Sequence, residues 1–244
     1  MSGFGRADLH IHTNASDGRP SPGEVVDFVV GHTNLDLIAI TDHDTIDGAL
    51  VAADLGLARG LPVIIGEEVS SREGHILGLF LQRPIKPGLS AQATVDAIHA
   101  QGGLAIAAHP FWRTTPNKSG SRPAHGVGWK GAELDLDAIE IENSTPGLGL
   151  ANLVARRFCA GTSLPPVGGS DAHIASAIGR AATSFPGRTV ADLQQAILAG
   201  TTGAERHRYD PATLLRYAAW GINLQLSPAR YQAAAPELGR EGFL

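Results

Sequence analysis

Side chains that can bind metal ions recur along this chain, each at the end or the beginning of a short apolar segment. Apolar segments such as LDLIAI and LPVIIG, rich in β-branched residues, are typical of strands buried on both faces of a sheet. If such strands run parallel, their carboxyl ends meet on one side of a sheet or barrel, and the side chains there converge on one pocket. The candidate ligands are His10, His12, Asp17, His43, Glu67, His75, His109, Asp171 and His173.

The ligand types in this set indicate the kind of metal. Imidazoles and carboxylates without a thiolate are typical of sites for hard-to-borderline divalent metals. The single cysteine, Cys159, excludes both an intrachain disulfide and a cysteine-based zinc site, and on its helix we expect it to be a small buried apolar residue. We therefore expect two or three divalent transition-metal ions, with Mn, Fe or Zn as the candidates.

Strand and helix patterns alternate along most of the chain. Helical segments such as SPGEVVDFVVGH and SAQATVDAIHAQGG begin at capping serines, Ser21 and Ser90, and separate the apolar strands. The segment HILGLFL is expected to be an antiparallel or bent continuation of the strand before it. This rhythm predicts a parallel α/β domain folded as a barrel.

Two regions interrupt the rhythm. Residues 111–131 are rich in Gly, Pro, Ser and cations, and a long loop of this kind is usually functional or disordered. Residues 203–244 contain one strong helical pattern, PATLLRYAAWGINLQL. We expect a catalytic barrel over residues 1–202 and a helical extension over residues 203–244 that packs on it.

Composition and charge restrict the partners. The formal net charge is −5, which gives no overall attraction to nucleic acid or to an anionic membrane, and no DNA-binding patch is evident. The N-terminal residues lack the apolar segment of a signal peptide, and no apolar run is long enough to cross a bilayer. The expectation is a cytoplasmic protein with no membrane partner.

Some of the candidate ligands come in pairs on one strand face. His10 and His12 are two residues apart, so both imidazoles can reach one ion; the alternative is a pair of half-buried histidines with other partners. Asp171 and His173 have the same spacing and follow glycines that allow close backbone approach. Asp17 stands in a Ser-Asp-Gly turn close to the end of the first strand.

Carboxylates accompany the second and third strands. In TDHD, Asp42 and Asp44 flank His43, and unpaired burial would be costly for such groups. Asp42 is a further candidate for a catalytic role, although this turn can also serve as a helix cap. Of Glu67 and its neighbour Glu68, one should point inward, where it can bridge two ions; Glu67 is our choice.

The remaining histidines are divided by their position. His109 ends the LAIAAHP strand and is a ligand candidate, whereas His75 is balanced between a ligand and a packed residue. A surface or capping role is expected for His32, His99, His125 and His207.

Taken in order, these motifs resemble one known family. ADLHIHTNASDG, AITDHDT, GEEVS with HILGL, AHP, and GGSDAH followed by IGRAAT are similar to motifs of the PHP family, named for polymerase and histidinol phosphatase. The resemblance implies a distorted seven-stranded (β/α) barrel, a cluster of two or three metals, and hydrolysis of phosphate esters. Within the family, the chain is most similar to stand-alone nucleotide phosphatases and RNA 5′-end exonucleases, but it lacks their inserted helical segment before the AHP strand.

The resemblance also implies how the ligands divide among the ions. One metal would be held by His10, His12, Glu67 and Asp171, and the second by Asp17, His43 and His173. Glu67 would bridge to a third metal completed by His75 and His109.

A phosphoryl group brings negative charge that needs cations. Arg113 and Arg180 follow candidate ligands closely and are expected to bind the substrate phosphate; the alternatives are a mobile loop for Arg113 and a surface ion pair for Arg180. Solvation is the expected role of Lys118, Arg122 and Lys130. Asn143, at a strand end, is equally suited to orienting substrate or forming a turn.

The expected activity is hydrolysis of a phosphate ester by a metal-activated water. The substrate would be a small phosphomonoester such as a nucleotide or a nucleotide bisphosphate, with short RNA as a further possibility. Two other readings stay open: an amidohydrolase-type deaminase or deacylase, whose first barrel strand also carries His-x-His, and a catalytically silent PHP module.

Overall fold

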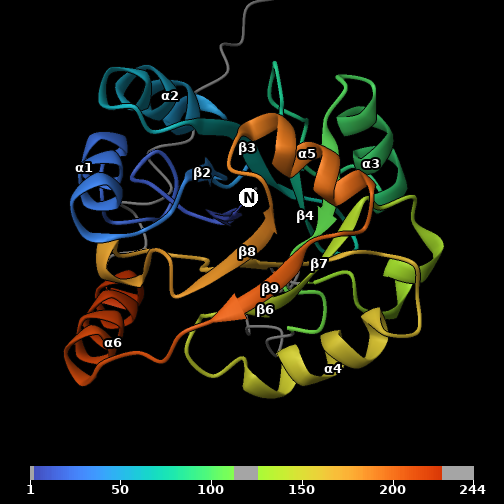
Figure 1. Ribbon diagram of the computed structural model, residues 1–244. Helices are drawn as coiled ribbons and strands as arrows, with labels where there is room; N and C mark the ends of the chain where they lie inside the picture. The colour runs from blue at the N-terminus through green and yellow to red at the C-terminus, as the bar shows by residue number, and fades with distance from the viewer. Residues whose placement is uncertain (1–2, 113–125, 227–244) are drawn as a thin grey trace, which may run out of the picture.

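The computed structural model describes residues 3–112 and 126–226 of the chain, as a curved sheet surrounded by helices (Figure 1). The strands are β1 (Phe4–Asp8), β2 (Leu37–Ile40), β3 (Val63–Ser70), β4 (His75–Leu79), β5 (Leu104–Ala107), β6 (Ala138–Asn143), β7 (Pro166–Gly169), β8 (Ala181–Pro186) and β9 (Gly203–Arg206). The helices are α1 (Pro22–His32), α2 (Asp47–Arg59), α3 (Ala91–His99), α4 (Gly149–Cys159), α5 (Val190–Leu198) and α6 (Pro211–Leu226), with short 3-10 helices η1 (Gly128–Glu133) and η2 (Ala175–Ala177).

The strands form one sheet in the order β7-β6-β5-β4-β3-β2-β1-β8-β9. Pairing is parallel between β1, β2 and β3 and between β5, β6 and β7, while β4 runs antiparallel to both of its neighbours. The expected antiparallel continuation over HILGLFL is therefore confirmed. The expected boundary at residue 202 falls directly before β9, which pairs with β8 in this sheet; the division of the chain into two domains stays a prediction.

The sheet curls until β7 approaches β8. The Thr183 hydroxyl on β8 accepts a hydrogen bond from the Gly168 amide at 3.0 Å and donates one to the Gly168 carbonyl at 2.9 Å. A Cβ atom at Gly168 would lie 2.5 Å from the Ala182 carbonyl oxygen, so glycine is required for this close approach. The result is a nearly closed, distorted barrel, which confirms the predicted α/β barrel class.

The barrel interior is apolar. Side chains from the inner faces of successive strands, including Leu9, Leu77 and Ile106, pack with Leu193 and Ile197 of α5. Helix α5 lies across the end of the barrel near the N-terminus (Figure 1). With that end covered, the opposite end, where β1, β2 and β5 finish, is left for a site.

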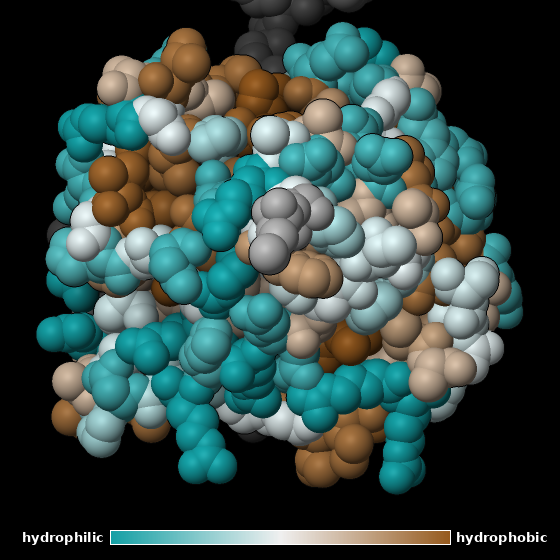
Figure 2. Space-filling view, viewed as in Figure 1, coloured by the Kyte–Doolittle hydropathy of each residue, from teal (hydrophilic) through white to brown (hydrophobic). Residues whose placement is uncertain are grey.

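The helices pack around the outside of the sheet. Helix α1 begins at the expected cap: the Ser21 hydroxyl accepts from the Glu24 amide, and the Glu24 carboxylate accepts in return from the Ser21 amide. Exposed apolar residues on α1 and α2 include Val30, Leu50 and Leu55, and apolar atoms gather over this region in Figure 2. Among the described residues, no helix is long and apolar enough to cross a membrane.

Candidate metal centre

Candidate ligands from separate strand ends meet at the open end of the barrel. The His10 and His12 rings, which follow β1, lie 5.1 Å apart between their centroids. The His12 ring stacks at 4.3 Å on His173, which follows β7, and lies 4.7 Å from His43, which follows β2. The expected convergence of residues far apart in sequence is therefore present.

One carboxylate lies at the centre of this cluster, and it belongs to Glu68. Its Oε1 atom lies 2.7 Å from His75 Nδ1 and 2.8 Å from His109 Nε2. Its Oε2 atom lies 3.1 Å from His10 Nε2, 3.2 Å from His12 Nε2 and 3.3 Å from His43 Nδ1. Each oxygen thus faces a different set of imidazoles, which is the arrangement required of a carboxylate that bridges ions.

Two further carboxylates complete the cluster. Asp171 Oδ1 lies 3.2 Å from His12 Nε2 and 3.6 Å from His173 Nδ1. Asp17 Oδ1 lies 3.1 Å from His173 Nε2, and its Oδ2 lies 3.8 Å from His43 Nε2. Both aspartates therefore reach the cluster from turns that follow the expected strands.

The side chains fall into three groups whose ligand atoms lie within 4.8 Å of one another. The groups are His10, His12, Glu68 and Asp171; His12, Asp17, His43 and His173; and His43, Glu68 and His75. Both ring nitrogens of His12 and the Oδ1 atom of Asp17 are buried and make no hydrogen bond to a described residue. Buried polar atoms without hydrogen bonds, set among oxygen and nitrogen donors, fit a cluster of divalent cations.

The pKa values of the imidazoles show how strongly the carboxylates act. Burial lowers the pKa of His10, but the charges of Asp171 and Glu68 outweigh it and raise the pKa well above its ordinary value. The same competition raises the pKa of His12 to about 10. For His43 burial prevails, and its pKa is lowered. Without metal, the centre therefore retains protons that bound cations would replace.

The carboxylates respond in the opposite direction. Burial alone would raise the pKa of Asp171, but the His10 charge lowers it well below the ordinary value. Burial would also raise the pKa of Glu68, but the charges of His75 and His43 lower it well below its ordinary value. These groups stay ionised and available as ligands.

Backbone conformation also marks the site. Asp171 has a φ of 53° and His109 a φ of 26°, values that are uncommon for residues with a Cβ atom. Such conformations persist where surrounding contacts hold them, and they concentrate at functional sites.

A layer of polar residues lies behind the cluster, and apart from Asn143 its members were not expected from the sequence. Glu140 on β6 accepts from His10 Nδ1 at 3.0 Å and from the His109 amide at 2.6 Å. Asn143 donates to Glu140 and to Asp171, each at 3.1 Å, and Thr145 donates to Asp171 at 3.1 Å. An acid within the apolar segment AIEIEN was the available signal, because a buried carboxylate needs partners.

The choice of Glu67 as the bridging residue is wrong. Its carboxylate lies outside the cluster and accepts a hydrogen bond from the Ile85 amide at 2.8 Å. Burial raises its pKa to about 8. Neighbouring residues on a strand point to opposite faces, so Glu68 takes the inward position and Glu67 the outward one.

The catalytic role expected for Asp42 is not supported by its contacts. One carboxylate oxygen accepts from the Thr13 amide at 2.7 Å and from the Ser16 hydroxyl at 2.6 Å. The other accepts from the Thr13 hydroxyl at 2.7 Å. Asp42 is thus a buried acceptor that shapes the turn leading to Asp17, and it does not line the pocket beside the cluster.

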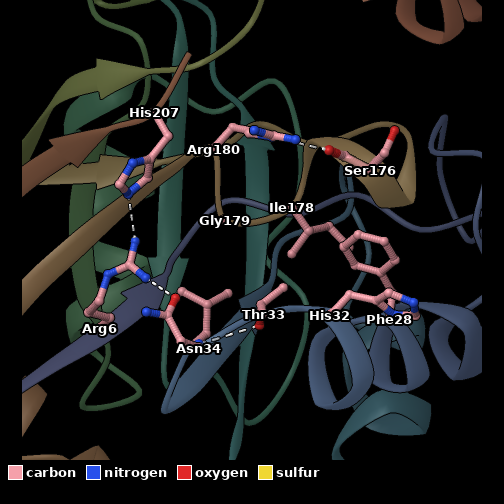
Figure 3. A pocket seen from close by; sticks show the side chains of 11 residues that line it. Arg6, Phe28, His32, Thr33, Asn34, Ser176, Ile178, Gly179, Arg180 and His207 are labelled. Carbon is pink, nitrogen blue, oxygen red and sulfur yellow. Dashed lines mark hydrogen bonds between the residues drawn. The ribbon is translucent and has the colours of Figure 1, made fainter. Parts of the chain in front are cut away.

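Arg180 also differs from the expectation. Its guanidinium donates to the Arg208 carbonyl at 3.0 Å and pairs with the Asp210 carboxylate at 2.8 Å, so the alternative of a surface ion pair holds. It lines a separate cavity of about 350 Å³ beside Arg6 and His207 (Figure 3). Since Arg6 is itself paired with Glu205 at 2.9 Å, both arginines of this cavity already have carboxylate partners.

The other sequence candidates are placed as follows. Arg113, Lys118, Arg122 and His125 lie outside the described residues. Lys130 pairs with Glu73 at 3.2 Å. His99 pairs with Asp137 at 2.8 Å, His32 stacks on Phe28, and His207 accepts from Arg6, so none of these histidines joins the cluster.

A pocket of about 210 Å³ opens onto the cluster. Beside the ligand candidates it is lined by Thr145 and by three aromatic residues, Trp112, Tyr217 and Trp220. The last two belong to α6, whose part in the site the sequence pattern did not reveal. Among the described residues that line this pocket there is no arginine or lysine.

Comparisons with known proteins agree with this geometry. Residues 149–202 match the family model described as PHP-associated. An uncharacterized protein of Methanocaldococcus jannaschii is 36% identical over 161 residues, which cover 62% of this chain and 88% of that protein. The chain belongs to the PHP family. Enzymes similar to this PHP protein include a phosphatase of nucleotides.

Two further matches are informative about the class. A 3′,5′-nucleoside bisphosphate phosphatase of Chromobacterium violaceum is 41% identical over 88 residues, covering 34% of this chain and only 30% of that enzyme. The crystal structure of a two-domain protein from Bacteroides vulgatus, containing a predicted PHP-like metal-dependent phosphoesterase, superposes with a TM-score of 0.69. That match has 20% identity and covers 88% of this chain and 69% of the other, so it supports the fold.

Proposed function

We propose that this PHP protein hydrolyses a small phosphomonoester, such as a nucleotide or a nucleotide bisphosphate, with a water activated by two or three divalent ions. The observation that carries the proposal is the position of Glu68, whose two oxygens face five imidazoles from four strand ends. A carboxylate of this kind supports a multinuclear centre rather than a single ion.

The proposed ligand sets are drawn from the groups of the structure, with His12 assigned to the first ion, His43 to the second, and His109 added to the third. One ion would be held by His10, His12, Glu68 and Asp171, and a second by Asp17, His43 and His173. Glu68, His75 and His109 would hold a third. When bound, such ions acidify a water and stabilise charge on the phosphoryl oxygens.

Residues of the chain would keep these ligands in the required form. Glu140 accepts from His10 Nδ1, which keeps a proton on that nitrogen and leaves Nε2 free to bind metal. Asn143 and Thr145 both donate to Asp171 Oδ2, so its Oδ1 atom remains directed toward the imidazoles. These hydrogen bonds fix the geometry before substrate arrives.

The pocket supports a small substrate. Its volume of about 210 Å³ suits the phosphoryl end of an ester, and its aromatic lining from Trp112, Tyr217 and Trp220 limits the water around the reacting group. Similarity to a nucleoside bisphosphate phosphatase supports a nucleotide as the ester. Arg113 stays the proposed cation for the phosphoryl group.

A substrate screen tests the proposal. Protein purified without chelator and loaded with Mn²⁺ would be assayed for phosphate release from mononucleotides, nucleotide 3′,5′-bisphosphates, 5′-phosphorylated short RNAs and sugar phosphates. We expect release from at least one nucleotide, loss of release with chelator, and recovery with Mn²⁺. His99→Ala is the control, because its ring pairs with Asp137 away from the cluster. Absence of release from every ester by fully metal-loaded protein would contradict the proposal.

A further inference from the structure

Helix α6 contacts the metal centre through two hydrogen bonds to main-chain carbonyls. The hydroxyl of Tyr217, a buried residue, donates to the Asp171 carbonyl at 2.9 Å. The indole of Trp220 donates to the Asp17 carbonyl at 3.3 Å, and its ring packs on His173 at 4.5 Å between centroids. Both acceptors thus belong to residues of the cluster, and both donors lie on one helix.

The start of α6 is fixed to the barrel. Asp210 caps the helix by accepting from the Thr213 amide at 2.9 Å and from the Thr213 hydroxyl at 2.8 Å. Arg180, directly before β8, pairs with the same Asp210 carboxylate at 2.8 Å and donates to the Arg208 carbonyl at 3.0 Å. Arg180, seen in Figure 3 beside the cavity, therefore anchors the segment that leads into α6.

The hydrogen bond from Tyr217 is made to a residue with an uncommon backbone conformation. Asp171 has a φ of 53°, so its main chain is held in a conformation that a free segment would rarely adopt. The donation from Tyr217 fixes the carbonyl of this same residue, whose carboxylate faces the imidazoles. A shift of this peptide would move the ligand atom with it.

We propose that α6 is a positioning element of the metal centre, with Tyr217 holding Asp171 and Trp220 holding Asp17. This inference rests on the metal centre of the proposed function and adds to it residues beyond 202, where the PHP-associated match ends. Tyr217 and Trp220 are positioning residues, because each acts through the main chain of another residue.

The two contacts serve different ion-binding groups. Asp171 belongs to the group with His10, His12 and Glu68. Asp17 belongs to the group with His12, His43 and His173. Loss of one contact should therefore weaken one ion more than the other, which a general loss of stability would not do.

The experiment is a calorimetric Mn²⁺ titration of the full-length, metal-free protein. Tyr217→Phe removes one hydroxyl and keeps the ring, and Trp220→Phe removes the indole donor while retaining an aromatic group against His173. Each variant should weaken one binding step by about tenfold, as is typical when a partner of a ligand is lost, and leave another step at the wild-type value. The step affected should differ between the two variants.

Tyr209→Phe is the matched control. Tyr209 lies just before α6, and its hydroxyl shares a hydrogen bond with Ser144 at 3.0 Å rather than with a residue of the ligand groups. This variant should bind Mn²⁺ as the wild type does. Should Trp220→Phe fail to fold, Tyr217→Phe alone decides, because it changes a single oxygen atom.

The outcomes separate this inference from the proposed function. A wild-type protein that binds no Mn²⁺ overturns the metal centre itself. Wild-type binding that is unchanged in Tyr217→Phe and Trp220→Phe leaves the centre intact and overturns the role of α6. Equal weakening of every step in both variants also overturns the assignment of one contact to one ion.

Discussion

Glu68 Oε1 lies 2.7 Å from His75 Nδ1, although the two residues come from opposite ends of their strands in sequence. Glu68 is near the end of β3, whereas His75 begins β4. Because β3 and β4 are antiparallel, the start of β4 lies at the same end of the barrel as the end of β3. The antiparallel pairing thereby brings His75 into the cluster, whereas in a parallel β4 the first residue would lie at the other end of the barrel.

Replacing Glu68 tests the centre of the cluster. Glu68→Gln should lower kcat/KM by on the order of 100-fold or more, because a bridging ligand is lost and charge and geometry change together. Steady-state kinetics and elemental analysis of the variant measure the two effects. Glu67→Gln is the matched control, because that carboxylate points away from the cluster and accepts from the Ile85 amide. Equal losses in both variants would refute the assignment of Glu68.

The burial of β3 on both faces explains why the sequence pattern did not show which of Glu67 and Glu68 points inward. Residues 63–66 of β3 are Val, Ile, Ile and Gly, so apolar side chains face both the barrel interior and the outer helices. A strand buried on both faces carries no polar and apolar alternation from which the inward residue can be read. Register with the neighbouring strands decides it, and this is a tertiary property.

Other parts of the site could be predicted from the sequence, because they depend on the spacing of residues close together in the chain. His10 with His12, and Asp171 with His173, are two residues apart after apolar strands, and parallel strands bring such ends together. The contribution of helix α6 to the site could not be predicted in this way. Its contact from Trp220 to Asp17 joins residues 203 positions apart, and no local pattern specifies which surface a helix will cover.

Glu140 should control metal affinity without being a ligand. Glu140→Gln removes the charge that orients His10 Nδ1, and a loss of about 10- to 100-fold in metal affinity is typical of such partners. Competition with a fluorescent chelator measures the affinity. Glu205→Gln serves as the comparison, since Glu205 pairs with Arg6 outside the cluster and should leave the affinity unchanged.

Kinetics distinguish the two arginines chosen from the sequence. At saturating Mn²⁺, Arg180→Ala should keep the wild-type KM for the phosphate ester, because Arg180 pairs with Asp210 and Arg208 at the start of α6 and does not line the pocket. Arg113→Ala should lower kcat by on the order of 100-fold if the guanidinium acts in the transition state, or raise KM if it binds substrate and transition state alike. Wild-type kcat/KM in Arg113→Ala would show that this arginine does not contact the phosphate.

Removal of metal should make stability depend on pH in a definite direction. The pKa of His12 is raised from 6.5 to about 10 by Asp171 and Glu68, against the effect of burial. A folded-state pKa above the unfolded value means that this stabilisation is complete below pH 6.5 and is lost as pH rises through 10. Urea unfolding of the chelator-treated protein should show this decline. Metal-loaded protein should not, because bound imidazoles carry no such proton.

Substitution of ligands should separate activity from folding. His12→Ala and Asp171→Ala should abolish turnover while circular dichroism stays close to that of the wild type, because the apolar barrel interior does not include either side chain. Phosphate release and metal content would be measured on the same samples. Turnover near the wild-type value in either variant, at full metal occupancy, would exclude that residue as a ligand.

The most direct test of the metal centre is anomalous X-ray diffraction from crystals of the Mn²⁺-loaded protein. The account predicts two or three manganese peaks at the open end of the barrel, one of them among His10, His12, Glu68 and Asp171. A single peak, or none in contact with Glu68, would contradict it.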